Sequence, residues 1–250
     1  FRRAIKKQTG IPMVRIPYSA LRKISVVFRE SDFDVQCVIR RTEQDIFVYD
    51  VYKKEEPVVI GGLAIDIGTT TVSALLINMQ TGEILGKASS GNGQIRYGAD
   101  VINRIIESMK PGGSEKLQKA VVKETINPMI EQMCRSCGFD PMHIYRMSIA
   151  SNTTMNHLLT GMNGDPIRME PYIPTFYKTN ALFANDIGIS VNPDAHIIMA
   201  PNIGSYVGGD ITAGTLVSML WNRPEFSLFI DLGTNGELVF GNSDFMMSCA

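Results

Sequence analysis

The stretch Leu63–Asn78, LAIDIGTTTVSALLIN, decides the fold, because the chain repeats its plan at Leu228–Asn242, LFIDLGTNGELVFGN. Each copy is an apolar run, then Asp-x-Gly-Thr, then a second β-rich stretch. The two copies lie about 165 residues apart. A repeat of a strand–turn–strand unit at that distance predicts a duplicated domain. We therefore expect an α/β protein with two facing hairpins.

Each turn also carries chemistry. Asp66 and Asp231 end predicted buried strands, where a carboxylate is costly unless it meets a cation or hydrogen-bond donors. Gly68 and Gly233 let the backbone approach a ligand, and the residues that follow add donors suited to phosphate. Two such hairpins would form a phosphate clamp. The residues predicted to contact phosphates are the glycines and the hydroxyl and amide residues of both turns: Gly68, Thr69, Thr70, Thr71, Gly233, Thr234, Asn235 and Gly236.

Composition narrows the class of protein. The 250 residues are 44% apolar and 20% charged, as in a soluble globular protein with a sizeable core. The net charge of -1 gives no electrostatic case for nucleic acid. No apolar run approaches the roughly 18 residues that span a membrane. The four cysteines are unevenly spaced, which favours free thiols in a reducing cytoplasm. The basic patch Arg2–Lys7 is interpreted as a solvated tail.

The chain divides into three predicted regions. Residues 1–57 form a small linker or docking subdomain that ends in a charged run and Pro57. Residues 58–222 form the first lobe, and residues 223–250 begin a second lobe. Because the chain starts without a methionine and stops just after a strand-like segment, we expect an internal fragment of a longer protein.

Periodicity predicts the elements of these regions. The strands expected are 34–40, 45–52, 58–67, 72–78, 83–89, 143–150, 196–200, 226–230, 237–240 and 245–248. The helices expected are 99–109, 115–137 with a cap at Ser114, 151–159 and 208–220. Residues 19–28 are ambiguous, and 170–194 reads as a long ordered loop. The continuous apolar run 58–67 is typical of a strand buried on both faces.

The repeat, in this strand context, resembles the phosphate motifs of the superfamily that joins actin, sugar and acetate kinases and heat-shock chaperone ATPases. No P-loop or dinucleotide-binding glycine motif competes with it. The segment Gly208–Gly214 matches that superfamily's connecting helix, which carries small residues and an acid. The resemblance implies a duplicated ribonuclease-H-like fold, with ATP and Mg²⁺ in the cleft between the lobes.

The resemblance also implies roles for single residues. Asp66 and Asp231 would hold Mg²⁺ largely through water, since Mg²⁺ dehydrates reluctantly. Asp210 would orient the attacking water or contact the metal, so that all three acids count as catalytic candidates. The alternative role for Asp210 is that of a helix N-terminal acid, which complements the helix dipole. Glu237 is a strand-face acid or a support for the metal. The remaining nucleotide-binding candidates are Asn152 and Thr153, which could instead be a helix cap, and Gly208 and Gly209.

Five motifs together are more specific than the superfamily: Gly62–Thr71, Tyr97–Ile102, Ser151–Gly161, Tyr206–Gly214 and Phe229–Glu237. They resemble the reductive activators of corrinoid-dependent methyl-transfer proteins, over roughly Val58–Ala250. That family implies an ATPase coupled to electron transfer, which reduces Co(II) corrinoid to Co(I) in a partner corrinoid protein or methyltransferase. A cytoplasmic location and a homodimer would fit.

The chain departs from the family pattern in its cysteines. The family's plant-type [2Fe–2S] domain needs Cys-x₄-Cys-x₂-Cys and a further cysteine, which this sequence lacks, so the cluster is expected in the full-length protein outside this fragment. The adenosine-binding part is expected beyond Ala250, and the fragment alone is expected to be inactive. Cys134 and Cys137 are two thiols near a helix end, or half of a cluster shared between two subunits as in the activators of 2-hydroxyacyl-CoA dehydratases. A small-molecule kinase and a nucleotide-gated interaction module remain as alternatives.

Overall fold

A computed structural model describes residues 1–180 and 182–250. These residues form two compact units, Phe1–Ile60 and Gly61–Ala250. The predicted division between a first and a second lobe at residues 222 and 223 falls inside the second unit and stays a prediction. Ala181, which belongs to the predicted loop 170–194, lies outside the described residues.

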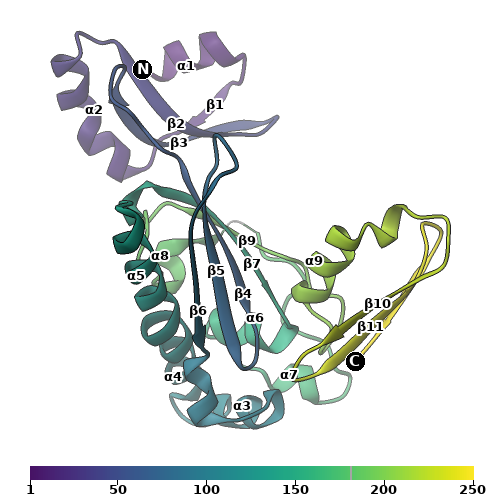
Figure 1. Ribbon diagram of the computed structural model, residues 1–250. Helices are drawn as coiled ribbons and strands as arrows, with labels where there is room; N and C mark the ends of the chain where they lie inside the picture. Colours follow the sequence, from purple (N-terminus) through teal and green to yellow (C-terminus); the bar gives the residue numbers. More distant parts are fainter. Residues whose placement is uncertain (181) are drawn as a thin grey trace. The chain divides into compact units, whose positions relative to one another are not determined.

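The first unit is a three-stranded sheet with two helices (Figure 1). In chain order its elements are α1 (Arg2–Thr9), β1 (Met13–Arg15), α2 (Tyr18–Glu30), β2 (Val35–Arg41) and β3 (Asp45–Lys53). β3 is central, parallel to β1 and antiparallel to β2. The predicted antiparallel pair is therefore confirmed, whereas β1, only three residues long, was not anticipated.

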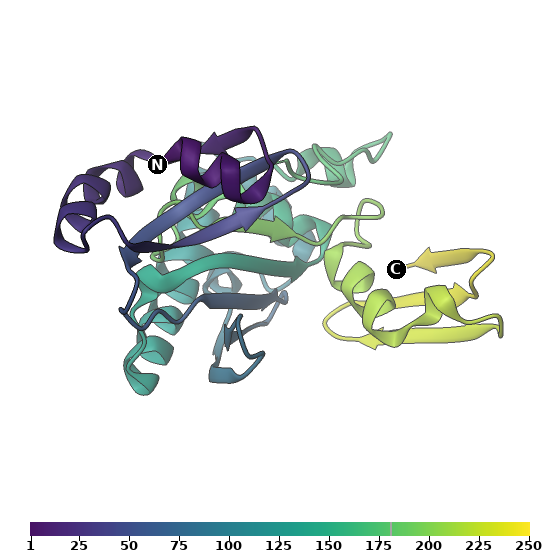
Figure 2. The ribbon, with the colours of Figure 1, turned by 90° about the horizontal axis from the view of Figure 1, so that it is seen from above.

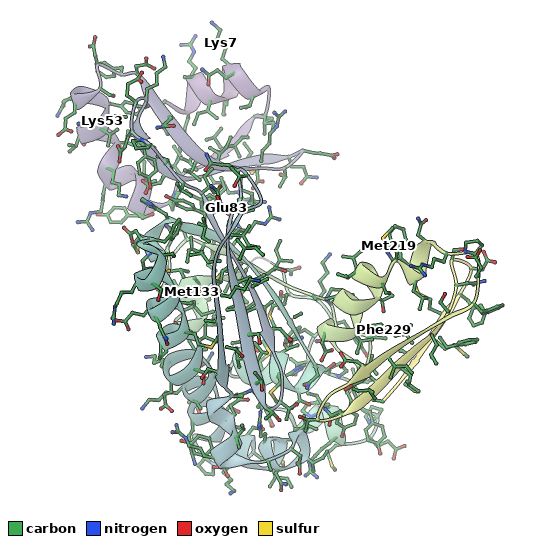
Figure 3. All side chains as sticks on the ribbon, in the orientation of Figure 1. Lys7, Lys53, Glu83, Met133, Met219 and Phe229 are labelled. Atoms are coloured by element: carbon green, nitrogen blue, oxygen red, sulfur yellow. The ribbon has the colours of Figure 1, made fainter. Side chains whose placement is uncertain are left out.

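Two further expectations for the first unit are settled by its helices. The ambiguous segment 19–28 is helical, as part of α2. The basic N-terminal patch is not an irregular tail, because it lies on α1, where Ile5 is buried among apolar residues and the basic side chains are exposed. Lys7 accordingly points away from the unit (Figure 3).

The second unit contains a six-stranded sheet in the order β6-β5-β4-β7-β9-β8. Its strands are β4 (Gly61–Ile67), β5 (Thr71–Asn78), β6 (Ile84–Gly91), β7 (Ile144–Ser151), β8 (Leu182–Phe183) and β9 (His196–Met199). β4, β5 and β6 form the predicted antiparallel meander, and β7 and β9 extend the sheet in parallel with β4. A meander followed by parallel strands is the order of a ribonuclease-H-like lobe, as expected.

The central strand β4 alternates rather than being buried on both faces. Leu63, Ile65 and Ile67 are buried in the core, while Ala64 is half-buried and Asp66 is exposed. The prediction of two buried faces was therefore wrong for this strand, because the face that carries Asp66 opens toward a cleft. That alternation is what delivers the carboxylate of Asp66 to the site.

Helices cover the buried face of the sheet. Those that pack there are α3 (Val101–Ser108), α4 (Gly113–Val121), α5 (Asn127–Cys137) and α6 (Thr153–Leu159). Figure 1 shows α4 and α5 running beside β6. Met133 of α5 faces that strand (Figure 3), and a Cβ on Gly86 would lie 2.7 Å from its Cγ. Small residues on β6 thus let the helix approach closely.

The predicted helix 115–137 has an interruption that periodicity does not reveal. Residues Val122–Ile126 form a π-helical turn, η2, between α4 and α5. The hydroxyl of Thr125 donates to the carbonyl of Ala120 at 2.9 Å and accepts from the N–H of Gly93 at 3.0 Å. The predicted cap at Ser114 was wrong: Gly112 is the N-cap, and the Ser114 hydroxyl donates to the carbonyl of Ser108.

The C-terminal part of the second unit is a second sheet with one helix, α9 (Gly209–Ser218). The sheet contains β10 (Ser227–Leu232), β11 (Gly236–Gly241) and β12 (Met246–Cys249), an antiparallel meander that Figure 2 shows grouped with α9. Phe229 of β10 faces α9 (Figure 3), and a Cβ on Gly214 would lie 2.4 Å from its ring.

Short elements complete the described chain: η1 (Gly93–Tyr97), η3 (Pro141–His143), α7 (Asp165–Arg168), α8 (Ala184–Ile187) and η4 (Leu220–Asn222). Of these, α8 and the two-residue strand β8 fall in the predicted loop 170–194, so that segment is less irregular than expected. None of the helices described is both long and apolar enough to cross a bilayer.

Candidate functional site

The first Asp-Gly-Thr turn connects β4 to β5. The N–H of Gly68 donates to the carbonyl of Thr71 at 2.9 Å, which closes the turn. A Cβ on Gly68 would lie only 2.7 Å from that carbonyl oxygen, so the position requires glycine. Thr69 is buried and Thr70 is exposed. The turn therefore has one hydroxyl in the protein and one toward solvent.

The second turn connects β10 to β11 with the same sequence plan. The N–H of Gly233 donates to the carbonyl of Asn235 at 3.0 Å. Thr234 is exposed, and its Oγ1 lies 2.8 Å from Oγ1 of Thr70. The tips of the two hairpins are therefore in direct contact, which is the facing arrangement that the repeat predicted.

A cavity of about 570 Å³ lies between the two turns. Eleven of the residues predicted to form the site line it: Asp66, Gly68, Thr69, Thr70, Thr71, Asn152, Asp210, Asp231, Gly233, Thr234 and Asn235. Five further lining residues are Ala150, Ala213, Gly214, Val217 and Glu237. A volume of this size falls within the usual range of small-molecule sites.

Four predicted site residues do not line the cavity. The hydroxyl of Thr153 donates to the carbonyl of Gly204 at 2.7 Å, and its side chain is buried. A Cβ on Gly208 would lie 2.4 Å from the backbone nitrogen of Thr153, and one on Gly209 would lie 2.4 Å from the carbonyl oxygen of Ala200. These glycines let the start of α9 pack against neighbouring backbone. Gly236 begins β11, with open space around its Cβ position.

Four carboxylates face the cavity, and no Lys, Arg or His is among the described residues that line it. Although Asp66 is open to the cavity, the protein around it removes part of its hydration; this desolvation, and then the charge of Asp231, raise the pKa of Asp66. Burial raises the pKa of Glu237, and the charges of Asp210 and Asp231 add to that rise. An acidic cluster without a cationic side chain is stabilised by a bound cation.

Asp210 is a helix N-terminal acid that also lines the cavity. It lies in the first turn of α9, and its Oδ1 accepts from the N–H of Ile211 at 2.8 Å, as a helix N-terminal acid does. Burial nevertheless raises the pKa of Asp210 to about 6, and the charges of Asp231 and Asp66 act in the same direction. The effect of burial and of the neighbouring acids on this pKa is therefore larger than that of the helix terminus. The pKa lies close to neutral pH, where a carboxyl can both accept and release a proton.

Glu237 is buried, pairs across the sheet with Asp231, and lines the cavity. A plain strand-face acid does not describe this position. Asn152 likewise has two functions at once. Its Oδ1 caps α6 by accepting from the N–H of Met155 at 2.9 Å, and its Nδ2 donates to Thr69 Oγ1 at 3.2 Å. The cap and the cleft-facing role are thus compatible.

The donor set fits Mg²⁺ bound through water rather than by a protein cage. Within residues 1–180 and 182–250, no group of three or more His, Cys, Asp or Glu converges on one ion. Mg²⁺ commonly keeps several waters and takes one or two carboxylates together with substrate phosphates. The separate carboxylates of Asp66 and Asp231 on opposite hairpins suit that mode of binding.

Two residues that sequence reasoning missed lie directly behind the first turn. Asn92 donates from Nδ2 to the carbonyl of Gly68 at 2.9 Å, and Arg104 donates from Nη2 to the carbonyl of Thr69 at 2.5 Å. Both side chains are buried. The sequence motif nearest to these residues is Tyr97–Ile102. It ends before Arg104 and does not indicate that this arginine is buried or supports the turn.

The cysteine pair lies in the last turn of α5. Cys134 is buried, and burial raises the pKa of its thiol to about 11. Cys137 is exposed, and its thiol donates to the carbonyl of Met133 at 3.2 Å. A buried thiol held in its protonated form is a poor cluster ligand. This geometry favours the interpretation of two thiols near a helix end.

The described residues define a class of protein: an α/β chain of the duplicated ribonuclease-H-like fold, with two Asp-Gly-Thr hairpins meeting at an acidic cavity. The family model described as the RACo middle region matches residues 61–223. The chain therefore belongs to the RACo middle region family. This confirms the resemblance to the reductive activators of corrinoid-dependent proteins.

Two known proteins are similar over most of the chain. The corrinoid activation enzyme RamQ of Eubacterium limosum is 33% identical over 228 residues, which cover 91% of this chain and 38% of that protein. A solved structure of a reductive activator for corrinoid, iron-sulfur protein matches with a TM-score of 0.89 and 37% identity, over 98% of this chain and 39% of the other. The chain thus spans about two fifths of the length of these relatives.

Proposed function

We propose that this chain is part of an ATP-dependent activator that reduces the Co(II) corrinoid of a partner protein to Co(I). The observation that carries this proposal is the cavity of about 570 Å³ between the two Asp-Gly-Thr turns, in a chain of the RACo middle region family. The names of both relatives, a corrinoid activation enzyme and a reductive activator, support the same activity.

The residues of the cavity divide the work of binding MgATP. Asp66 and Asp231 hold the hydrated metal ion from opposite hairpins. The N–H and hydroxyl groups of Thr69, Thr70 and Thr234, with the amide of Asn235, bind the phosphates. Asp210 uses Oδ1 to accept from Ile211, which leaves Oδ2 to orient a water molecule. ATP supplies the free energy when its terminal phosphate is hydrolysed.

The coupling to electron transfer is conformational. Nucleotide and corrinoid protein each prefer one arrangement of the two hairpins, so each biases the other. The electrons come from a [2Fe–2S] domain of the full-length protein, outside these residues. We further propose that the full-length protein is cytoplasmic and dimeric, and that residues 1–250 alone have little or no ATPase activity.

The test uses the full-length protein with Asp66→Asn and Asp231→Asn, which keep the side-chain size but remove the charge. ATP-dependent formation of Co(I) is followed by its visible spectrum. Each variant should lose at least about 100-fold in rate, the order of effect seen when one electrostatic contact to a transition state is removed. Asp244→Asn, on the exposed turn before β12, is the matched control and should activate normally. Normal activation by both site variants would refute the assignment.

A further inference from the structure

The first turn is held from behind at every carbonyl group. Asn92 Nδ2 donates to Gly68 O at 2.9 Å, Arg104 Nη2 donates to Thr69 O at 2.5 Å, and the N–H of Asn92 donates to Thr70 O at 2.8 Å. All three acceptors therefore point into the protein and away from the cavity. Within residues 1–180 and 182–250, no such set of donors holds the second turn.

The orientation of the carbonyl groups sets the orientation of the N–H groups. In a trans peptide the C=O and the N–H of one peptide unit point in opposite directions. With Gly68 O and Thr69 O directed inward, the N–H groups of Thr69 and Thr70 are directed outward, toward the cavity that these residues line. Outward N–H groups in succession form an anion-binding surface.

Arg104 is the least expected member of this arrangement. Its side chain is fully buried, and within the described part of the chain it forms no ion pair with an acid. Its guanidinium instead donates to the carbonyls of Thr69 and Gly98 and to Gln94 Oε1. A buried cation without a partner anion lowers stability. Stabilisation of the fold is therefore a weak explanation for an arginine at this position.

We propose that Arg104, together with Asn92, is a positioning residue that holds the first turn with its N–H groups aimed at the phosphates of a nucleoside triphosphate. This inference rests on the proposed function of the cavity as a nucleotide site. Arg104 does not touch the ligand itself. It acts through the carbonyl of Thr69, and its positive charge lies behind a cavity whose other charged groups are all acids.

The surrounding structure is built to place this guanidinium. A Cβ on Gly98 would lie 2.8 Å from the backbone nitrogen of Arg104, so the glycine of the Tyr97–Ile102 motif permits the start of α3 to fold over η1. Gln94 accepts a hydrogen bond from Nη1 of Arg104 through its Oε1. Its Nε2 donates to the carbonyl of Leu117 at 3.0 Å, which fixes the side chain. The motif Tyr97–Ile102 has no predicted contact with nucleotide, and this packing gives it a role in placing Arg104.

The π-helical turn belongs to the same support. The Thr125 hydroxyl accepts from the N–H of Gly93, which directly follows Asn92. A Cβ on Gly93 would lie 2.8 Å from the carbonyl oxygen of Ala120, so the two backbones are in close contact there. Burial lowers the pKa of Arg104 to about 10, and the group remains a cation at neutral pH.

The experiment measures binding by calorimetry in the full-length protein, with MgATP and with adenosine as separate ligands. Arg104→Met keeps the length of the side chain and removes the donors and the charge. We expect its affinity for MgATP to fall at least 10-fold while its affinity for adenosine stays unchanged, because the defect is confined to the phosphates. Ile105→Ala is the control: it is buried in the same helix, its side chain has no hydrogen-bonding group, and the substitution should alter neither affinity.

Three results would overturn the proposal. They are unchanged MgATP affinity in Arg104→Met, equal losses for both ligands, and an equal phosphate-specific loss in Ile105→Ala. A wild-type protein that binds no MgATP would instead refute the nucleotide site, and the positioning role with it. If Arg104→Met does not fold, Arg104→Lys replaces it. Lysine lacks the planar fork that reaches several carbonyls at once, so a phosphate-specific loss of several fold is again expected, and wild-type affinity would contradict it.

Discussion

The two Asp-Gly-Thr turns share a sequence plan but differ in their surroundings. In the first turn, Ile67 is 1% exposed and Thr69 is 5% exposed, whereas Leu232, the counterpart of Ile67, is 87% exposed. Asn92 and Arg104 hold the backbone of the first turn from behind. The second turn has its own bond from Gly233 to Asn235 and the contact between Thr234 and Thr70.

The first turn alone shows that the motif specifies a hairpin and its side chains but not its rigidity. Rigidity comes from a second layer of residues that the motif does not contain. The first turn is pre-organised, so binding costs it little conformational entropy. Among the described residues fewer donors hold the second turn, and we infer that nucleotide orders it. Such an arrangement makes the second turn the part that responds to ATP.

Hydrogen exchange provides the sharpest test of this comparison. The N–H groups of Gly68 and Gly233 occupy equivalent positions and each has one backbone acceptor, at 2.9 and 3.0 Å. Gly68 donates three residues along the chain and Gly233 two, so their difference in exchange reports each turn's bond together with its surroundings. We expect the Gly68 amide to exchange on the order of 100-fold more slowly in the absence of nucleotide, because local opening there disrupts buried contacts.

Addition of MgATP should slow exchange at Gly233 more than at Gly68, which has less to gain. The measurement is exchange mass spectrometry or NMR on the full-length protein at constant pH. Equal exchange at the two glycines without nucleotide would show that the bracing by Asn92 and Arg104 has no energetic consequence. The comparison between a rigid and a responsive turn would then fail.

Glycine-to-alanine substitution tests the same pair of positions by stability. A Cβ on Gly68 would lie 2.7 Å from the carbonyl oxygen of Thr71, whereas one on Gly233 would lie 3.6 Å from that of Asn235. Gly68→Ala should therefore lower the free energy of unfolding by about 2 kcal/mol, as overpacking against backbone does. Gly233→Ala should change it by less than about 0.5 kcal/mol. Urea unfolding of both variants measures these changes. Similar losses of unfolding free energy in the two variants would contradict the difference between the two turns.

Much of the fold was predictable, since it depends on local pattern. Alternating and continuous apolar runs predicted both meanders, and the repeat predicted that the two turns face each other. The sheet order agrees with the predicted fold class. The errors occur where distant contacts accompany a departure from the local pattern: the exposed face of β4 opens to the cavity, and the turn η2 contains Thr125, which bonds to Gly93.

The site was predictable where side chains of the motif line the cavity, and not where other residues support the turn. Asp66 and Asp231 could be found because their types and spacing repeat. Arg104 could not, since an arginine on an amphipathic helix is normally exposed. Gly208 and Gly209 do not line the cavity and pack against neighbouring backbone, and their predicted contact with nucleotide stays a prediction.

Asp210 lies where the influences of both turns combine, and it gives the smallest predicted effect. Its folded pKa of about 6 exceeds the ordinary value of 3.8. Between these values the native state retains a proton that the unfolded state has released, so stability falls as pH rises through this window. Asp210→Asn removes the effect and should stabilise the nucleotide-free protein by about 1 kcal/mol at pH 7, because water at the cavity screens part of the full shift.

The gain from Asp210→Asn should be largely lost near pH 3.5, where the wild-type carboxyl is mostly protonated in both states. Thermal unfolding at the two pH values measures this gain in stability. An equal gain at both pH values would mean that it comes from packing.

The two turns can also be compared by how strongly the acid of each one raises the pKa of Asp210. The charge of Asp231 raises the Asp210 pKa more than that of Asp66 does. Asp231→Asn should therefore lower the Asp210 pKa, followed by carboxyl NMR, further than Asp66→Asn. The reverse order would mean that the braced turn, and not the responsive one, controls the protonation of Asp210.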